Sequence, residues 1–98
     1  MRDITPLVAP TSIAVVGAST DPTKSGGVLF GNLAAGGFRG RLYPINPRAD
    51  EILGIKAYPD IAAVPEQVDL AYIVLPREYA RTAIEQCAAA GVRAACIV

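Results

Sequence analysis

The sequence predicts an α/β fold in which helices cover both faces of a parallel sheet. Continuous apolar runs, such as residues 12–17, have the length and composition of strands that are buried on both sides. Amphipathic segments alternate with these runs, and the clearest of them spans residues 77–90. Because parallel strands are joined by right-handed crossover connections, this alternation places helices on both sides of one sheet. We therefore expect a Rossmann-like, doubly wound sheet with three α/β/α layers.

Glycines and prolines divide the chain into its elements. Two adjacent glycines, Gly36 and Gly37, supply a C-terminal stop for the first helix, and Gly91 does the same for the last. Pro10 closes the lead-in, and Pro76 stops the third main strand. The expected order is a lead-in with a single helical turn (3–9), a strand (12–17), a helix (25–36), a strand (41–45), a turn with a minor strand (51–58), a short helix (59–64), a strand (69–75), a helix (77–90) and a strand (94–98).

Both main helices have apolar residues at helical spacing, which is typical of a helix that packs on a sheet. These residues are Val28, Leu29, Leu33 and Ala34 in the first helix, and Ala80, Ala83, Ile84, Cys87 and Ala88 in the second, where we expect them to form one buried stripe.

The last expected strand, 94–98, has no covering helix after it. We therefore expect the sheet to be truncated on its C-terminal side, and residues 1–98 to form one domain at the N-terminus of a longer protein. Exposed sheet edges and a missing final layer favour association with further protein, within one chain or in an oligomer.

Composition narrows the choice of partners. Nine basic residues balance nine acidic ones, so no general field attracts nucleic acid or anionic lipid. No apolar run is long enough to span a bilayer, and the first residues lack the apolar stretch of a signal peptide. We expect a cytoplasmic protein without nucleic-acid or membrane partners.

The cysteines and the absence of histidine limit the chemistry of the chain. Cys87 and Cys96 form no CxxC pair and are expected to be reduced thiols. Two distant sulfurs cannot fill a tetrahedral zinc site, and a chain without histidine lacks the usual general base for serine or cysteine catalysis. The sequence therefore predicts neither a metal site nor a catalytic residue.

A Gly/Ser/Thr-rich turn follows the first strand directly and leads into the first helix. This order points a helix N-terminus and free backbone N–H groups at an anion. Hydroxyl groups add hydrogen-bond donors, and a lysine adds a mobile positive charge. An alternative stays open, in which the hydroxyls are only helix N-caps and the lysine is a solvated surface charge. The candidate phosphate-binding residues are Gly17, Ala18, Ser19, Thr20, Lys24, Ser25 and Gly26.

The turn differs from the G-x-G-x-x-G dinucleotide fingerprint. Ser19 and Pro22 stand where the second and third glycines would be. The end of the second strand has no acidic residue before Asp50, whereas NAD enzymes usually bind the ribose hydroxyls with one there. Asn46 can instead bond to a ribose or base, and Arg48 can pair with a phosphate on that ribose. NADP and coenzyme A both carry such a phosphate, so an NADP-binding oxidoreductase half-domain stays open as an alternative.

Taken together, the sequence resembles the CoA-binding domain at the N-terminus of NDP-forming acyl-CoA synthetases, and is similar to the succinyl-CoA synthetase α subunit. The resemblance covers nearly the whole chain in order. It is carried by SIAVVGAS (12–19), GG (26–27), NL (32–33), GGFRG (36–40), LYPINP (42–47), ILG (52–54), AYP (57–59), VDLAYIVLP (68–76) and CAAAGV (87–92).

The resemblance implies a role for each part of the site. The first turn would take the CoA phosphates. The adenosine end would lie against Asn46, Pro47 and Arg48. The pantetheine arm would be guided by the strand end at Val74, Leu75 and Pro76.

The family reaction joins a carboxylic acid to CoA, with cleavage of a nucleoside triphosphate, through an acyl phosphate and a phosphorylated histidine. Since the chain has no histidine, the resemblance implies that the catalytic histidine and the ATP-grasp part, with ATP/ADP and Mg²⁺, lie downstream or on another chain. This chain would then be the CoA-binding module of an acid–thiol ligase. A regulatory or acetyltransferase-fused CoA-binding domain without ligase activity stays open.

Overall fold

The computed structural model describes residues 9–98, and the expected lead-in at 3–9 lies almost wholly outside them. The elements are β1 (Ser12–Val16), α2 (Ser25–Ala35), β2 (Arg41–Ile45), β3 (Glu51–Ile52), β4 (Ile55–Lys56), the 3₁₀ helix η1 (Ile61–Ala63), β5 (Leu70–Ile73), α3 (Arg77–Ala89) and β6 (Ala94–Ile97). The four main strands and two main helices agree with the expected ones to within two residues at each end.

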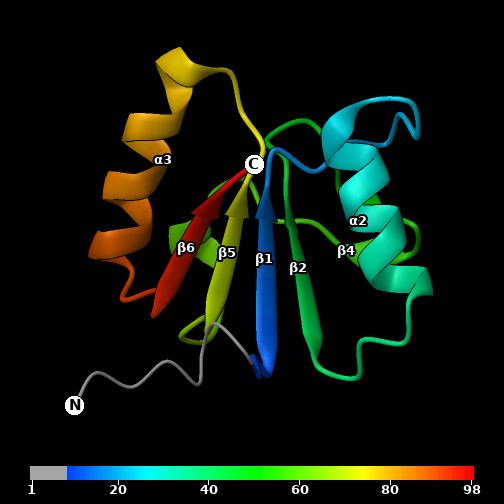
Figure 1. Cartoon of the computed structure of the whole chain (residues 1–98), viewed down its shortest axis with the longest axis horizontal. Helices are drawn as coiled ribbons and strands as arrows, with labels where there is room; N and C mark the ends of the chain where they lie inside the picture. Colours follow the sequence, from blue (N-terminus) through cyan, green and yellow to red (C-terminus); the bar gives the residue numbers. More distant parts are fainter. Residues whose placement is uncertain (1–8) are drawn as a thin grey trace.

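A four-stranded parallel sheet has the order β2-β1-β5-β6 (Figure 1). The chain leaves β1 towards one edge to form β2, then crosses back to form β5 and β6 on the other side of β1. The strand order therefore reverses between β1 and β5. In open α/β sheets, ligands bind beyond the carboxyl ends of the strands at such a reversal.

The two main helices cover opposite faces of this sheet, with α3 on one side and α2 on the other in Figure 1. Successive strand residues point to opposite faces. Ile13 and Val15 accordingly pack in one core cluster with Phe30 of α2, while Ala14 and Val16 pack in a second cluster with α3. The expected doubly wound α/β fold is confirmed.

The buried residues of the helices differ in part from the expected stripes. In α3, Ala80, Ala83 and Cys87 are buried, but Ile84 is 38% exposed and Ala88 is also exposed. The helix meets the sheet along a narrow stripe that does not extend to Ile84 and Ala88. In α2 the fully buried side chain is Phe30, while apolar side chains at the expected spacing are half-buried or exposed.

The connection between β2 and β5 differs from the sequence prediction in two places. Strands β3 and β4 form a short antiparallel hairpin in place of one minor strand. Its turn residues, Leu53 and Gly54, both have positive φ angles (54° and 77°), as a tight two-residue hairpin requires. The expected helix at 59–64 is only the 3₁₀ turn η1, capped by the side chain of Asp60. It ends at Ala63, because the next residue, Val64, precedes a proline and therefore favours extended backbone.

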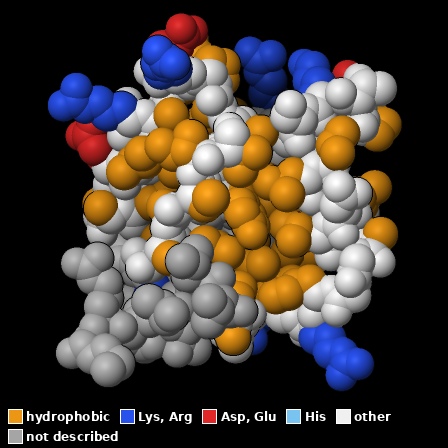
Figure 2. All heavy atoms as spheres, in the orientation of Figure 1, with side chains coloured by type: hydrophobic (Ala, Val, Ile, Leu, Met, Phe, Trp, Pro, Cys, Tyr) orange, Lys and Arg blue, Asp and Glu red, His pale blue; other side chains and the backbone are white. Residues whose placement is uncertain are grey.

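Hydrophobic side chains occupy the middle of the face shown in Figure 2, and the Lys and Arg side chains visible there are scattered around the periphery. A helix with the length and apolar character needed to cross a bilayer is not found between residues 9 and 98. Cys87 and Cys96 are both free thiols, the first buried and the second half-buried. Burial raises the pKa of the Cys87 thiol, and its side chain packs in the core cluster that contains Ala80 and Ala83.

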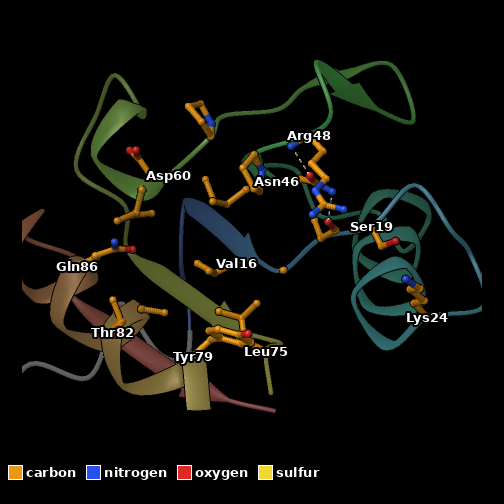
Figure 3. A pocket seen from close by; sticks show the side chains of 17 residues that line it. Val16, Ser19, Lys24, Asn46, Arg48, Asp60, Leu75, Tyr79, Thr82 and Gln86 are labelled. Atoms are coloured by element: carbon orange, nitrogen blue, oxygen red, sulfur yellow. Dashed lines mark hydrogen bonds between the residues drawn. The ribbon is translucent and has the colours of Figure 1, made fainter. Parts of the chain in front are cut away.

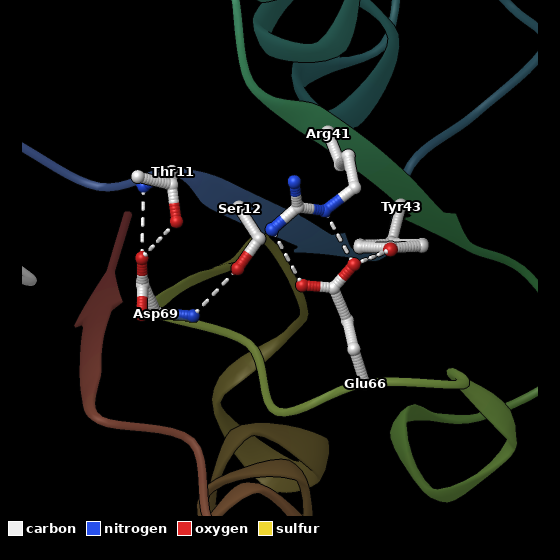
Figure 4. Close-up of polar contacts among 6 residues, drawn as sticks. All are labelled: Thr11, Ser12, Arg41, Tyr43, Glu66 and Asp69. Atoms are coloured by element: carbon white, nitrogen blue, oxygen red, sulfur yellow. Dashed lines mark hydrogen bonds and ion pairs between the residues drawn. The ribbon is translucent and has the colours of Figure 1, made fainter.

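Two carboxylates organise the amino-terminal ends of the strands (Figure 4). Glu66 accepts hydrogen bonds from Arg41 and from the Tyr43 hydroxyl, and the Arg41 Nη2–Glu66 Oε1 distance is 2.8 Å. Asp69 Oδ2 accepts from the backbone N–H of Thr11 (2.8 Å) and from its hydroxyl (2.7 Å). The Arg41 hydrogen bond lowers the pKa of Glu66, and the Thr11 backbone hydrogen bond lowers the pKa of Asp69.

Acid is expected to destabilise the fold through these two carboxyl groups. Because their pKa values are lower in the folded than in the unfolded protein, the unfolded protein binds more protons in mild acid. Their stabilising contribution is complete above the unfolded pKa of about 4, and it is lost as the pH falls through the folded pKa. Urea unfolding between neutral and acidic pH should show the free energy of unfolding falling. Glu66→Gln and Asp69→Asn should each flatten that dependence, and a slope identical to that of the wild type would contradict this assignment.

Candidate functional site

A pocket of about 520 Å³ opens beyond the carboxyl ends of β1, β2 and β5, where the strand order reverses (Figure 3). A second pocket of about 400 Å³ adjoins it. Both are lined by Gly17, Ser19, Lys24 and Leu75, so they form two lobes of one site. The shared residues lie at the turn between β1 and α2 and at the end of β5.

The structure brings together nearly all of the site residues predicted from the sequence. Those that line the first lobe are Gly17, Ala18, Ser19, Lys24, Asn46, Pro47, Arg48 and Leu75. Those that line the second lobe but not the first are Ser25, Gly26, Val74 and Pro76. Thr20 lines neither lobe and is exposed. The ligand contacts of all these residues stay predictions.

Close backbone packing shapes the turn between β1 and α2. Gly17 has φ = +96°, and a Cβ atom there would lie 2.1 Å from the carbonyl oxygen of Val74. At Gly26, in the first turn of α2, a Cβ atom would lie 1.9 Å from the carbonyl oxygen of Gly17. Only glycine fits at either position. The two glycines therefore hold the N-terminus of α2 against the ends of β1 and β5.

The start of α2 has the features of an anion site. Its N-cap residue, Lys24, makes no side-chain hydrogen bond to the helix. The hydroxyl of Ser19 accepts from the backbone N–H of Asp21 (3.0 Å), so it does not cap α2. The structure therefore does not show Ser19 as an N-cap of α2, and whether the exposed Lys24 contacts a ligand or is a solvated surface charge stays a prediction. The first N–H groups of α2, with the positive end of the helix dipole, face the site.

Two cations border the first lobe. Figure 3 shows Lys24 beside the start of α2 and Arg48 at the tip of β2. Neither forms an ion pair with any of residues 9–98. Both charges are available to a phosphorylated ligand. Within the same residues, no group of three or more His, Cys, Asp or Glu side chains could hold a metal ion.

One wall of the first lobe was missed by the sequence analysis. It is formed by Asp60 at the start of η1 and by Tyr79, Thr82 and Gln86 on α3 (Figure 3). Tyr79 is 58% exposed. A signal was available, because these three α3 residues recur at helical spacing, each one position before a residue of the buried stripe. They therefore form a polar stripe beside the buried one.

A family model described as "CoA binding domain" matches residues 11–98. The chain belongs to this family. Two curated relatives of this CoA-binding domain are ADP-forming acetate–CoA ligase II of Archaeoglobus fulgidus and the α subunit of ADP-forming acetate–CoA ligase II of Pyrococcus furiosus. The first is 42% identical over 96 residues, which are 98% of this chain and 14% of the relative. The second is 40% identical over 90 residues, which are 91% of this chain and 19% of the relative.

Solved structures agree with this assignment. The dinucleotide-forming acetyl-coenzyme A synthetase 1 of Ca. Korarchaeum cryptofilum, in complex with phosphate and ADP, matches the CoA-binding domain with a TM-score of 0.93 and 47% identity. The match covers 97% of this chain and 20% of that one. The predicted family and fold are confirmed. The chain spans a fifth or less of the length of these three relatives.

Proposed function

We propose that this domain holds CoA at the carboxyl edge of its sheet as the CoA-binding part of an ADP-forming acyl-CoA ligase. The observation that carries the proposal is the two-lobed site, whose lobes meet at the N-terminus of α2 in a chain of the CoA-binding family. CoA has a matching shape, because a diphosphate joins its nucleoside to its pantetheine arm.

The diphosphate of CoA would lie where the two lobes meet. Gly17, Ser19 and Lys24 line both lobes there. The first N–H groups of α2 can donate to phosphate oxygens, and the helix dipole favours negative charge at the same place. Lys24 adds a full positive charge. The place where the lobes meet therefore suits the charged diphosphate, which links the two halves of CoA, better than either lobe alone does.

The first lobe would hold the 3′-phosphorylated adenosine. Its volume of about 520 Å³ is within the usual range for small-molecule sites. Arg48 stands at its rim and can pair with a phosphate on the ribose through its guanidinium. Apolar contacts from Pro47 and Ile61 suit a base, and Gln86 on α3 provides a polar group across the lobe.

The second lobe would take the pantetheine arm. Val74, Leu75 and Pro76 follow β5, and Val98, which follows β6, also lines the lobe. These residues present apolar surface to the methyl and methylene groups of the arm. The arm would leave the junction past the carboxyl ends of β5 and β6. The family's assignment of the β5 end to pantetheine therefore agrees with the shape of the site.

In the reaction this domain would hold CoA so that its thiolate attacks the carbonyl carbon of an acyl phosphate and displaces inorganic phosphate. The chain has no histidine, so the phosphohistidine step of such ligases needs other parts. Those parts, with ATP, ADP and Mg²⁺, would belong to the same protein or to a second subunit. Relatives of both kinds exist, since one is named as a single ligase and another as an α subunit.

Ligand preference tests the proposal directly. Calorimetric titrations of the intact protein with CoA, dephospho-CoA, NADPH and ATP should show CoA binding most tightly. A protein that binds NADPH alone would instead be an NADP-dependent oxidoreductase half-domain. Binding of CoA without acyl-CoA synthesis by the intact protein would favour a regulatory domain.

Lys24→Ala and Arg48→Ala are each expected to weaken CoA binding about tenfold, because each removes a charge-assisted contact at a partly solvated site. The loss should be larger at low salt, where such contacts are screened less. Arg48→Ala should affect CoA more than dephospho-CoA, whereas Lys24→Ala should affect both. Arg81→Ala, on the exposed side of α3, is the matched control and should leave both affinities unchanged. Unchanged titrations of the first two variants would remove their side chains from the site.

A further inference from the structure

We propose that Asn46 is a positioning residue that ties the phosphate turn to Arg48, so that preference for a 3′-phosphorylated ligand depends on it. The inference rests on the function proposed above and deepens it. It assigns Asn46 a role through its neighbours, in place of the direct contact with ribose or base that its position after β2 suggests.

The side chain of Asn46 joins two separate segments of the site (Figure 3). Its Nδ2 donates to the carbonyl oxygen of Ala18 at 3.0 Å, across 28 positions of sequence. Its Oδ1 accepts from the backbone N–H of Arg48 at 2.8 Å. One amide group therefore connects the turn that follows β1 with the tip that follows β2.

The backbone around Asn46 is itself firmly held. Its N–H donates to the carbonyl oxygen of Tyr58 at 2.9 Å, and the N–H of Gly17 donates to the carbonyl oxygen of Ile45 at 3.2 Å. Ile45 and Gly17, the residues before Asn46 and Ala18, are thus already joined by a backbone hydrogen bond. The side-chain amide of Asn46 adds a second hydrogen bond between the same two segments, one residue further along each of them.

The chemistry of the link requires an amide. Ala18 offers a carbonyl oxygen and needs a donor, while the backbone of Arg48 offers an N–H and needs an acceptor. Asparagine supplies both groups. Aspartate would place an anion against the Ala18 oxygen, and serine is too short to reach it. Because both groups of the Asn46 amide are hydrogen-bonded within the protein, this side chain connects two parts of the site.

The link to Arg48 restricts the loop that carries the guanidinium. The contact from Asn46 Oδ1 to the N–H two residues on is an Asx turn, and Pro47 between them has a restricted φ. The backbone of Arg48 is thereby held at a set position relative to the phosphate turn. An ordered loop loses less freedom when its side chain pairs with a phosphate, which favours ligands that carry one there.

A double-mutant cycle in the intact protein tests the link. CoA and dephospho-CoA are titrated into the wild type, Asn46→Ala, Arg48→Ala and the double variant. The wild type should prefer CoA by about tenfold or more, from one charge-assisted phosphate contact. Asn46→Ala should reduce that preference at least about fivefold. In the Arg48→Ala background, Asn46→Ala should change the preference no further, because Asn46 acts through Arg48.

Gln67→Ala is the matched control. Gln67 Nε2 also donates to a distant backbone carbonyl oxygen, that of Gly91, at 2.7 Å. It lies at the amino-terminal end of β5, and neither lobe includes it. Its loss should lower stability without changing the ratio of the two affinities. Where Asn46→Ala is too unstable to titrate, Asn46→Ser serves, because serine can still accept from the Arg48 N–H but cannot reach Ala18.

The outcomes separate this inference from the proposed function. An equal loss of CoA and dephospho-CoA affinity in the Asn46 variants would overturn the positioning role. So would a change in preference that persists in the Arg48→Ala background. A wild-type protein that binds neither ligand would overturn the proposed function, and this inference with it. Both the inference and the proposed function would be supported if Asn46→Ala reduces the preference for CoA over dephospho-CoA in the wild-type background but not in the Arg48→Ala background.

Discussion

Gly26→Ala is expected to lower the free energy of unfolding by about 3 kcal/mol and to abolish CoA binding. A Cβ atom at this position would lie 1.9 Å from the backbone carbonyl oxygen of Gly17, and neither partner is a flexible side chain that could move aside. The start of α2 would have to shift away from the turn. The N–H groups proposed to bind the diphosphate would shift with it, so stability and binding should be lost together.

Gly31→Ala provides the matched control within the same helix. A Cβ atom at Gly31 would meet no other atom within 4 Å. Alanine should therefore raise stability by about 0.5–1 kcal/mol, through its higher helix propensity, and leave binding unchanged. Thermal unfolding and CoA titration of both variants would check the pair. Equal changes of stability and CoA affinity in Gly26→Ala and Gly31→Ala would contradict the close approach of α2 to the Gly17 carbonyl oxygen.

Phe30→Ala is expected to lower the free energy of unfolding by about 3–5 kcal/mol. Phe30 is fully buried (0% exposed) and packs in the core cluster of Ile13, Val15 and Leu70. Removing its ring would leave a cavity between α2 and the sheet. This loss is a large part of the stability of a domain of this size, and denaturant unfolding measures it.

The Phe30 variant should differ from the Gly26 variant in one respect. The residues that line the two lobes do not include Phe30, so the protein that remains folded should bind CoA as the wild type does. Val28→Ala, on the same helix but 46% exposed, should cost about 0.5 kcal/mol or less. A Phe30 variant as stable as the Val28 variant would contradict the packing described for α2.

The order of the main elements could be predicted because it depends on local pattern. Apolar runs such as 12–17 form buried strands wherever both faces of a sheet are covered, and Gly91, with φ = +75°, ends α3 as predicted. The hairpin at Leu53 and Gly54 was harder to predict. Its turn needs a positive φ at a leucine, a conformation that leucine rarely adopts, and the pairing of β3 with β4 across a two-residue turn imposes it.

The buried face of each helix could be predicted only in part. Helical spacing identifies which residues share a face, but not how wide a stripe the sheet covers. In α3 the covered stripe excludes Ile84 and Ala88 and leaves the neighbouring polar stripe beside the pocket. In α2 the close approach at Gly26 and Gly27 turns the helix so that Phe30 lies in the core.

The sequence by itself determined the α/β class, the turn after the first strand and the candidate residues around it, because each follows from spacing and residue type within a short stretch. Only the tertiary structure decided that η1 and α3 form the far wall of the pocket. It also decided that the amide of Asn46 bonds to Ala18 and Arg48. These relations join segments that are distant in sequence, and they depend on how the strands are ordered in the sheet, which no local pattern records.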